Sequence, residues 1–185
     1  MRVTAGRLKG RALAVPSGRE VRPTSDKVRQ AIFNILRHGD FGGFVLQGAR
    51  VIDLFAGSGA LGIEALSRGA RYALFIEDSA EARAAIRANV EAMGLTGVTK
   101  IWRRDAAGLG RNTGGPFDLA FLDPPYRRNL VAPGLLSLRA GGWLRPSALA
   151  VAETAADEDV PLTEGYEILD QRTYGETRVL FLRAI

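Results

Sequence analysis

Residues 51–62 read VIDLFAGSGALG, an apolar run that leads into a cluster of glycines and small side chains. The apolar run over 50–54 predicts a buried strand, and the apolar spacing after the glycines predicts a helix. Gly57, Gly59 and Gly62 fit the pattern G-x-G-x-x-G, in which glycine permits positive φ and lets a ligand approach the backbone. This unit predicts the first ligand-binding turn of a Rossmann-like α/β sheet.

The same alternation of strand and helix continues along the rest of the chain. Further strands are expected at 72–76, 99–103, 117–122, 149–153, 166–173 and 177–182, with helices at 59–68, 80–93 and 130–138. Strands that alternate with helices form a parallel sheet covered on both faces, whereas the last two strands follow one another directly and can pair antiparallel. The expected fold class is α/β, with a seven-stranded, mostly parallel sheet that ends in an antiparallel hairpin.

The first forty residues are expected to form a small extension. Strand candidates at 2–5 and 12–15 predict a hairpin, and residues 23–26 (PTSD) have the composition of a helix start. We therefore expect two units, residues 1–40 as a basic hairpin and helix and residues 41–185 as the α/β domain.

The positive charge of the chain is concentrated in that extension. Residues 1–40 carry nine basic and three acidic side chains, whereas the net charge of all 185 residues is +5. This imbalance indicates a face that binds a polyanion next to a neutral body, although a solvated basic face is the simpler alternative. The side chains expected to contact RNA are Arg7, Lys9, Arg11, Arg22, Thr24 and Arg29.

Composition excludes several classes of site. The chain has no cysteine, so disulfides, thiolate metal sites and cysteine nucleophiles are excluded. A single histidine, His38, argues against a zinc site or a serine–histidine triad, and no metal is expected. Uncharged apolar runs are shorter than about ten residues and no signal-peptide core is present, so we expect a cytoplasmic protein, monomeric by default.

Two acidic residues are placed to hold a cofactor. Glu77 follows the second expected strand, twenty residues after Gly57, where a carboxylate can accept hydrogen bonds from ribose hydroxyls. Asp53 lies at the end of the first strand, where it would repel a pyrophosphate but suit the ammonium of a methionine moiety. This favours S-adenosylmethionine over a nicotinamide cofactor. The expected cofactor contacts are Asp53, Phe55, Gly57, Ser58, Gly59, Glu77, Asp105 and Ala106, of which Asp105 could equally be a solvated loop residue.

The strand over 117–122 runs directly into Asp123, Pro124, Pro125 and Tyr126. A carboxylate and a rigidly held backbone carbonyl could accept the two N–H bonds of an exocyclic base amine, and a tyrosine ring could stack on a flipped-out base. Sites of open α/β sheets lie at the carboxyl ends of strands. These four residues are therefore the expected catalytic residues, against the alternative of a plain Pro-Pro turn.

Residues 53–62 and 123–126 together resemble the class I amino-methyltransferases. The N-terminal stretches 6–11 (GRLKGR), 22–29 (RPTSDKVR) and 32–34 (IFN) are similar to the RsmD family of bacterial 16S rRNA guanine-N2 methyltransferases. That resemblance implies a class I fold and methyl transfer from S-adenosylmethionine to the N2 amine of one guanine, number 966 in that family's naming. The implied partner is 16S rRNA, within the small ribosomal subunit or its assembly intermediate.

Other functions remain open from the residues alone. The Asp-Pro-Pro-Tyr tetrad also suits adenine N6 in RNA or DNA, and a non-catalytic RNA-binding assembly factor would share the basic extension. A nicotinamide dehydrogenase would leave the tetrad without a role. The acidic run over 153–159 is expected to be a solvated loop.

Overall fold

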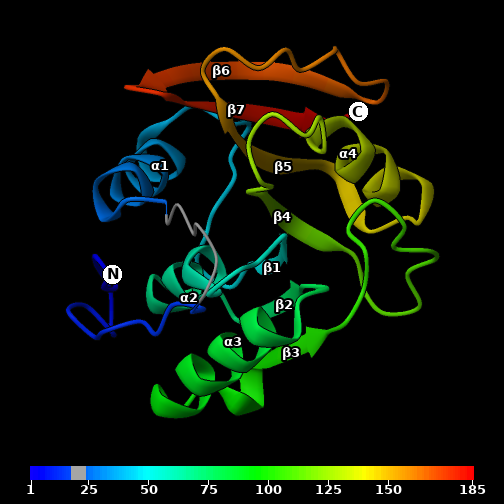
Figure 1. Ribbon diagram of the computed structural model, residues 1–185. Helices are drawn as coiled ribbons and strands as arrows, with labels where there is room; N and C mark the ends of the chain where they lie inside the picture. Colours follow the sequence, from blue (N-terminus) through cyan, green and yellow to red (C-terminus); the bar gives the residue numbers. More distant parts are fainter. Residues whose placement is uncertain (18–23) are drawn as a thin grey trace.

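The computed structural model describes residues 1–17 and 24–185 and is built around one twisted sheet (Figure 1). The sheet has seven strands in the order β3-β2-β1-β4-β5-β7-β6. The strands are β1 (Arg50–Leu54), β2 (Tyr72–Ile76), β3 (Thr99–Trp102), β4 (Phe117–Leu122), β5 (Leu144–Ala155), β6 (Tyr166–Tyr174) and β7 (Thr177–Ala184). Strands β1 to β5 pair in parallel, and β7 pairs antiparallel with both β5 and β6. This is the class I S-adenosylmethionine-dependent methyltransferase fold, so the predicted fold class is confirmed.

Helices cover both faces of the sheet. They are α1 (Asp26–His38), α2 (Ala60–Ser67), α3 (Ala80–Ala92) and α4 (Val131–Ala140), with a 3₁₀ turn at Thr96–Val98. Side chains alternate across a strand, so Val51 of β1 packs with α1, α2 and α3, while Ile52 and Leu54 pack with α4. In the described part of the chain no helix has the length and apolar character needed to cross a membrane.

Element boundaries from β1 onward follow the predictions closely, with one marked exception. Strands β1, β2 and β4 begin and end as predicted, and Ser25 caps α1 by accepting a hydrogen bond from the backbone N–H of Val28 at 3.1 Å. Strand β5 starts at Leu144 instead of Leu149, because it continues through the exposed residues 145–147 before it enters the core. Apolar periodicity detects only the buried part of such a strand.

The N-terminal hairpin packs against the sheet domain and does not stand apart from it. Its two arms meet at a single antiparallel bridge, Arg2 with Ala12, instead of forming full strands. Val3, Leu8 and Leu13 are buried in the same hydrophobic cluster as α1 and α2. Gly6 has φ +81°, and a Cβ there would lie 2.0 Å from the carbonyl oxygen of Ser67, so this close approach to α2 requires glycine.

A buried carboxylate fastens the hairpin and α1 to α2. Glu64 of α2 is fully buried and accepts hydrogen bonds from the backbone N–H groups of Thr4 at 2.9 Å and Ala5 at 3.1 Å. The same carboxylate pairs with Arg29 at 3.1 Å and with Arg68 at 2.9 Å. Removing one partner of such a buried pair typically costs about 3–5 kcal/mol, so Glu64 is a strong anchor for the first forty residues.

Candidate active site

The glycine loop and the Asp-Pro-Pro-Tyr tetrad emerge side by side at one edge of the sheet. Leu54, the last residue of β1, pairs with Ile76 at the end of β2 and with Leu122 at the end of β4. Because β1 lies between β2 and β4, the segments that follow these three strands must share one edge. The structure thus brings together three groups that the sequence predicted separately, the glycine loop, Glu77 and Asp123.

The glycine loop is a tight turn that depends on missing side chains. Phe55, Gly57 and Gly59 have φ of +56°, +60° and +79°. A Cβ on Gly62 would lie 2.5 Å from the Phe75 ring, so only glycine lets α2 pack this closely on β2. The backbone N–H of Gly62 donates to Asp53 Oδ2 at 3.0 Å, which ties the start of α2 to the end of β1.

Asp53 has an oxygen directed at no protein donor. Its side chain is fully buried, and its Oδ1 atom has no hydrogen-bond partner among the described residues. Burial raises the pKa of this carboxyl well above its usual range, and the nearby charges of Asp123 and Glu77 raise it further. A buried carboxylate oxygen of this kind is costly unless a cationic or donating group binds to it. It therefore fits the ammonium group of a methionine moiety.

Glu77 is the second carboxylate on the cofactor side of the site, which comprises the glycine loop, Asp53 and Glu77. Its carboxylate accepts from the backbone N–H of Gly57 at 2.8 Å and from that of Ser79 at 3.0 Å. Burial raises the pKa of Glu77, although these two hydrogen bonds favour the charged form. Each carboxylate oxygen keeps a further lone pair for a hydroxyl donor. Together, these acceptor oxygens of Glu77 and Asp53 fit a cofactor with an amino group and a ribose, as S-adenosylmethionine has.

The other predicted cofactor residues surround the loop at differing depths. Ser58 is buried, and its carbonyl accepts from the Asn89 side chain at 2.9 Å. Asp105 is exposed and accepts from the backbone N–H of Ala107 at 2.9 Å, while Ala106 is buried. Contacts of Phe55, Ser58, Asp105 and Ala106 with a cofactor remain predictions.

The tetrad and the side chains that contact it form the second half of the site, called the target side below. There, Tyr126 is anchored through its hydroxyl. That hydroxyl donates to Glu153 Oε1 at 3.1 Å and lies 2.6 Å from the hydroxyl of Thr177. Glu153 is a buried residue of β5, and Thr177 begins β7. The ring is half-buried, so one end is fixed by the sheet while part of it is open to a ligand.

Thr24 belongs to this target side and is not placed to contact RNA. Its hydroxyl lies 2.6 Å from Asp123 Oδ2 and 2.7 Å from Glu153 Oε2, and it can donate its single proton to either carboxylate. Only 4% of Thr24 is exposed. The predicted RNA contact is therefore wrong for Thr24, because the residue is turned inward against the tetrad.

Arg29 is a second correction. It is fully buried and donates to Glu64 at 3.1 Å, to Asp26 at 2.8 Å and to backbone carbonyls. A guanidinium whose donors are used inside the protein is not available to a phosphate. Basic composition alone could not separate this interior arginine from the exposed ones.

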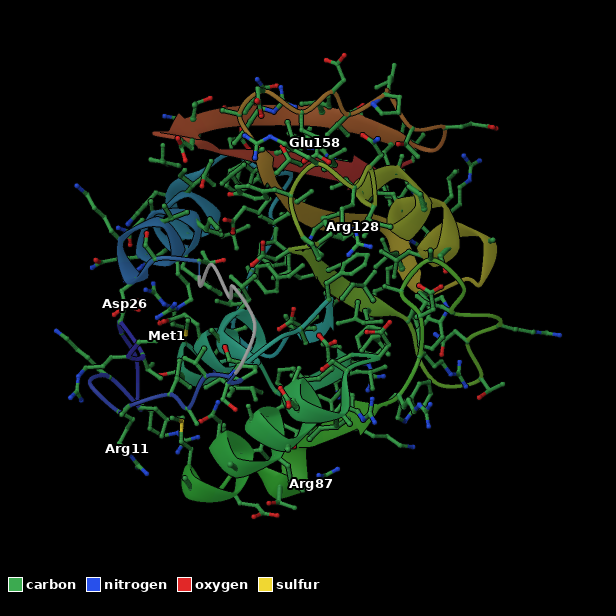
Figure 2. All side chains as sticks on the ribbon, in the orientation of Figure 1. Met1, Arg11, Asp26, Arg87, Arg128 and Glu158 are labelled. Carbon is green, nitrogen blue, oxygen red and sulfur yellow. The ribbon has the colours of Figure 1, made fainter. Side chains whose placement is uncertain are left out.

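The remaining basic candidates divide by position. Arg7, Lys9 and Arg11 are exposed on the hairpin, where Figure 2 labels Arg11 near the outer end of α3. Arg11 also donates to the carbonyl of Ala92 at 2.7 Å, which holds its guanidinium against α3. RNA contact by these three residues remains a prediction, and Arg22 lies outside the described residues.

The acidic run over 153–159, which begins within β5 and continues past its end, is the main site feature that sequence reasoning missed. Glu153 and Glu158 are buried, with 2% and 7% exposed, so the expectation of a solvated loop over 153–159 is wrong at these positions. Glu153 follows the apolar residues 148–152 of its strand, but that pattern alone does not distinguish a buried carboxylate from the start of a solvated loop. Within residues 1–17 and 24–185, no group of three or more His, Cys, Asp or Glu side chains is arranged to hold a metal ion.

Comparison with known proteins gives a family match over nearly the whole chain. The model of the family described as conserved hypothetical protein 95 matches residues 1–183. Ribosomal RNA small subunit methyltransferase D of Escherichia coli is 36% identical over 162 residues, which cover 87% of this chain and 78% of the relative. The protein of the same name from Haemophilus influenzae is 32% identical, with 95% of this chain and 89% of the relative covered. The solved structure of hypothetical protein TTHA0928 from Thermus thermophilus superposes with a TM-score of 0.75 at 29% identity, covering 98% of each chain.

Proposed function

This chain belongs to the family described as conserved hypothetical protein 95, and we propose that it transfers a methyl group from S-adenosylmethionine to the N2 amine of a guanine in 16S rRNA. The observation that carries the proposal is the tetrad at the end of β4 beside the glycine loop at the end of β1. The printed names of the relatives from E. coli and H. influenzae support small-subunit rRNA as the substrate. The site nominally corresponds to guanine 966.

The cofactor side is proposed to work through three groups. Asp53 Oδ1 accepts the ammonium group, Glu77 accepts the ribose hydroxyls, and the bare backbone at Gly57 allows close approach. When bound, S-adenosylmethionine supplies a methyl group attached to a positively charged sulfur. An amine can attack this methyl group in line and displace the sulfur. The residues on this side only bind and orient, so their loss should weaken cofactor binding before it affects chemistry.

The target side is proposed to prepare a weak nucleophile. The lone pair of an exocyclic base amine is delocalised into the ring, and the Asp123 carboxylate with the Pro124 carbonyl would accept its two N–H bonds and favour a pyramidal nitrogen. Pro124 and Pro125 fix the backbone that carries this carbonyl. Tyr126, held through Glu153, offers a ring on which the flipped-out guanine can stack, a contact worth about 1–3 kcal/mol.

Asp123 is also placed to receive a proton. Once the methyl group is on nitrogen, the amine carries a positive charge and releases a proton readily, so Asp123 need not be a strong base. The Thr24 hydroxyl lies 2.6 Å from Asp123 Oδ2 and helps to orient this carboxylate at the end of β4. Most of the rate enhancement is then expected from positioning.

The experiment that tests this proposal is a nucleoside analysis. The protein is incubated with isotopically labelled S-adenosylmethionine and small ribosomal subunits that lack their native methylation, and the digested RNA is examined by mass spectrometry. Labelled N2-methylguanosine supports the proposal, and fragment mapping then tests guanine 966. Labelled N6-methyladenosine overturns it in favour of an adenine enzyme, since the tetrad suits either amine. Absence of both label and cofactor binding overturns it in favour of a non-catalytic assembly factor.

A further inference from the structure

The chain makes a strained turn immediately after the tetrad. Arg127 and Asn129 have φ of +59° and +53°, although neither is glycine. Non-glycine residues in this left-handed region are disfavoured, and such strain persists only where the surroundings hold the backbone in place. Two such residues within three positions, directly beside the proposed base-binding tyrosine, indicate that neighbouring groups hold this turn in a disfavoured conformation.

Glu158 is the group that holds the turn. Its carboxylate accepts from the backbone N–H of Arg127 at 2.9 Å and from that of Asn129 at 3.1 Å. A third backbone donor, Ala155, lies 3.4 Å away. Glu158 is 7% exposed, so this buried carboxylate satisfies the turn from the inside.

Arg128 lies between the two residues that Glu158 holds. Arg128 itself is exposed, while the amides on either side of it donate to the buried Glu158. Arg127 pairs with Asp157 at 3.0 Å, whereas Arg128 makes no hydrogen bond or ion pair with any residue that the structure describes. Figure 2 labels Arg128 and Glu158 in the same upper part of the molecule, far from Arg87 on α3.

The free guanidinium stands next to the tetrad. Only Arg127 lies between Tyr126 and Arg128, so the Cα atoms of Tyr126 and Arg128 are at most about 7 Å apart, and an arginine side chain spans a similar distance. A base that is turned out onto Tyr126 carries its own phosphate groups to the mouth of the site. The carboxylates of Asp123 and Glu153 repel those phosphates, so a cation is needed beside them.

We propose that Arg128 binds an RNA phosphate, that of the methylated nucleotide or of its immediate neighbour. This inference rests on the proposed function for its RNA substrate and adds a phosphate contact outside the N-terminal extension. A guanidinium offers five donors in a planar fork that matches phosphate oxygens, and none of the five is used by a residue within 1–17 or 24–185. Glu158 is the positioning residue for this contact, because it fixes the turn that presents Arg128.

The test compares Arg128→Ala with Arg87→Ala. Arg87 is a matched control, since it is also an exposed arginine without a hydrogen bond or ion pair among the described residues. Binding to a labelled 16S rRNA fragment is measured over a range of salt concentrations, alongside cofactor binding and steady-state kinetics. We expect Arg128→Ala to raise the dissociation constant and the KM for RNA about 10-fold and to reduce the salt slope of binding by about 0.7–0.9, with cofactor binding unchanged. Arg128→Lys should keep most of the slope, and Arg87→Ala should match the wild type.

A second variant tests the role of the turn. Glu158→Gln keeps one acceptor oxygen and leaves at least one of the backbone amides without an acceptor, so we expect the KM for RNA to rise while the salt slope, which counts the charge on Arg128, changes little. Equal salt slopes and KM values for Arg128→Ala and Arg87→Ala overturn the inference while leaving the proposed function intact. If the wild type methylates no RNA, the proposed function fails, and the salt slope still decides whether Arg128 contacts phosphate.

Discussion

The cofactor side and the target side of the site differ in how far along the chain their contacts reach. On the cofactor side, Gly62 binds Asp53 across nine residues and Gly57 binds Glu77 across twenty. On the target side, Tyr126 reaches Thr177 across 51 residues and Thr24 reaches Asp123 across 99. One side is a local motif, whereas the other is assembled from four distant segments.

This difference means that the two sides can fail independently. A local motif keeps its geometry as long as one strand–turn–helix unit is folded, because its contacts close short loops. The target side also needs the first forty residues docked through Glu64, since Thr24 is carried by the segment that precedes α1. Cofactor binding and turnover should therefore separate under mutation.

The largest expected effect comes from Asp123→Ala. This variant removes the carboxylate that orients the base amine but leaves the glycine loop and Glu77 untouched, so turnover should fall by about 10³-fold or more. Isothermal titration with S-adenosylmethionine should still give a dissociation constant near that of the wild type. Loss of cofactor binding in this variant would show that the two sides are not separable and that the assigned roles are wrong.

A smaller effect is expected from Thr24→Val, which keeps the shape of the side chain and removes its hydroxyl. Because Asp123 and Glu153 both lose their contact with Thr24, we expect kcat to fall about 10-fold, with little change in cofactor binding. Thr24→Ser restores the hydroxyl and should recover most of kcat. A Thr24→Ser variant as slow as Thr24→Val would mean that the methyl group, not the hydroxyl, is what matters at this position.

The smallest effect is expected on the pH dependence of stability, and it tests Asp53 on the cofactor side. Burial raises the pKa of Asp53, so the folded protein keeps this proton after the unfolded chain has released it, and stability falls as the pH rises from about 4 through the raised pKa. Asp53→Asn keeps an oxygen for the N–H of Gly62 but does not titrate. In thermal unfolding without cofactor, the midpoint temperature of Asp53→Asn should rise relative to that of the wild type as the pH rises. The difference should be about 2–4 °C for each kcal/mol of unfolding free energy that the wild type loses. It should also bind S-adenosylmethionine more weakly. Parallel midpoint curves for the two proteins would rule out Asp53 as the source.

The same contrast explains what the sequence could predict. The strands of the sheet, its closing antiparallel hairpin, the glycine loop and the places of Glu77 and the tetrad at strand ends were predictable, because each follows from a short pattern with its own period or spacing. Glu153 and Arg29 were not, since a buried charge is recognisable only with its partner, and their partners Thr24 and Glu64 lie far away in the chain. Composition described all basic residues of the extension alike, although Arg29 supports the core and Arg11 faces solvent.

The Glu64 anchor also sets an order of events during synthesis. The basic N-terminal segment leaves the ribosome before α2, whose Glu64 accepts from Thr4 and Ala5 and follows about sixty residues later, and Glu153 comes later still. At about 5–20 residues per second this leaves the segment undocked for several seconds. A newly made chain can therefore fold its cofactor-binding unit before Thr24 reaches Glu153, so the target side is the last part of the enzyme to be completed.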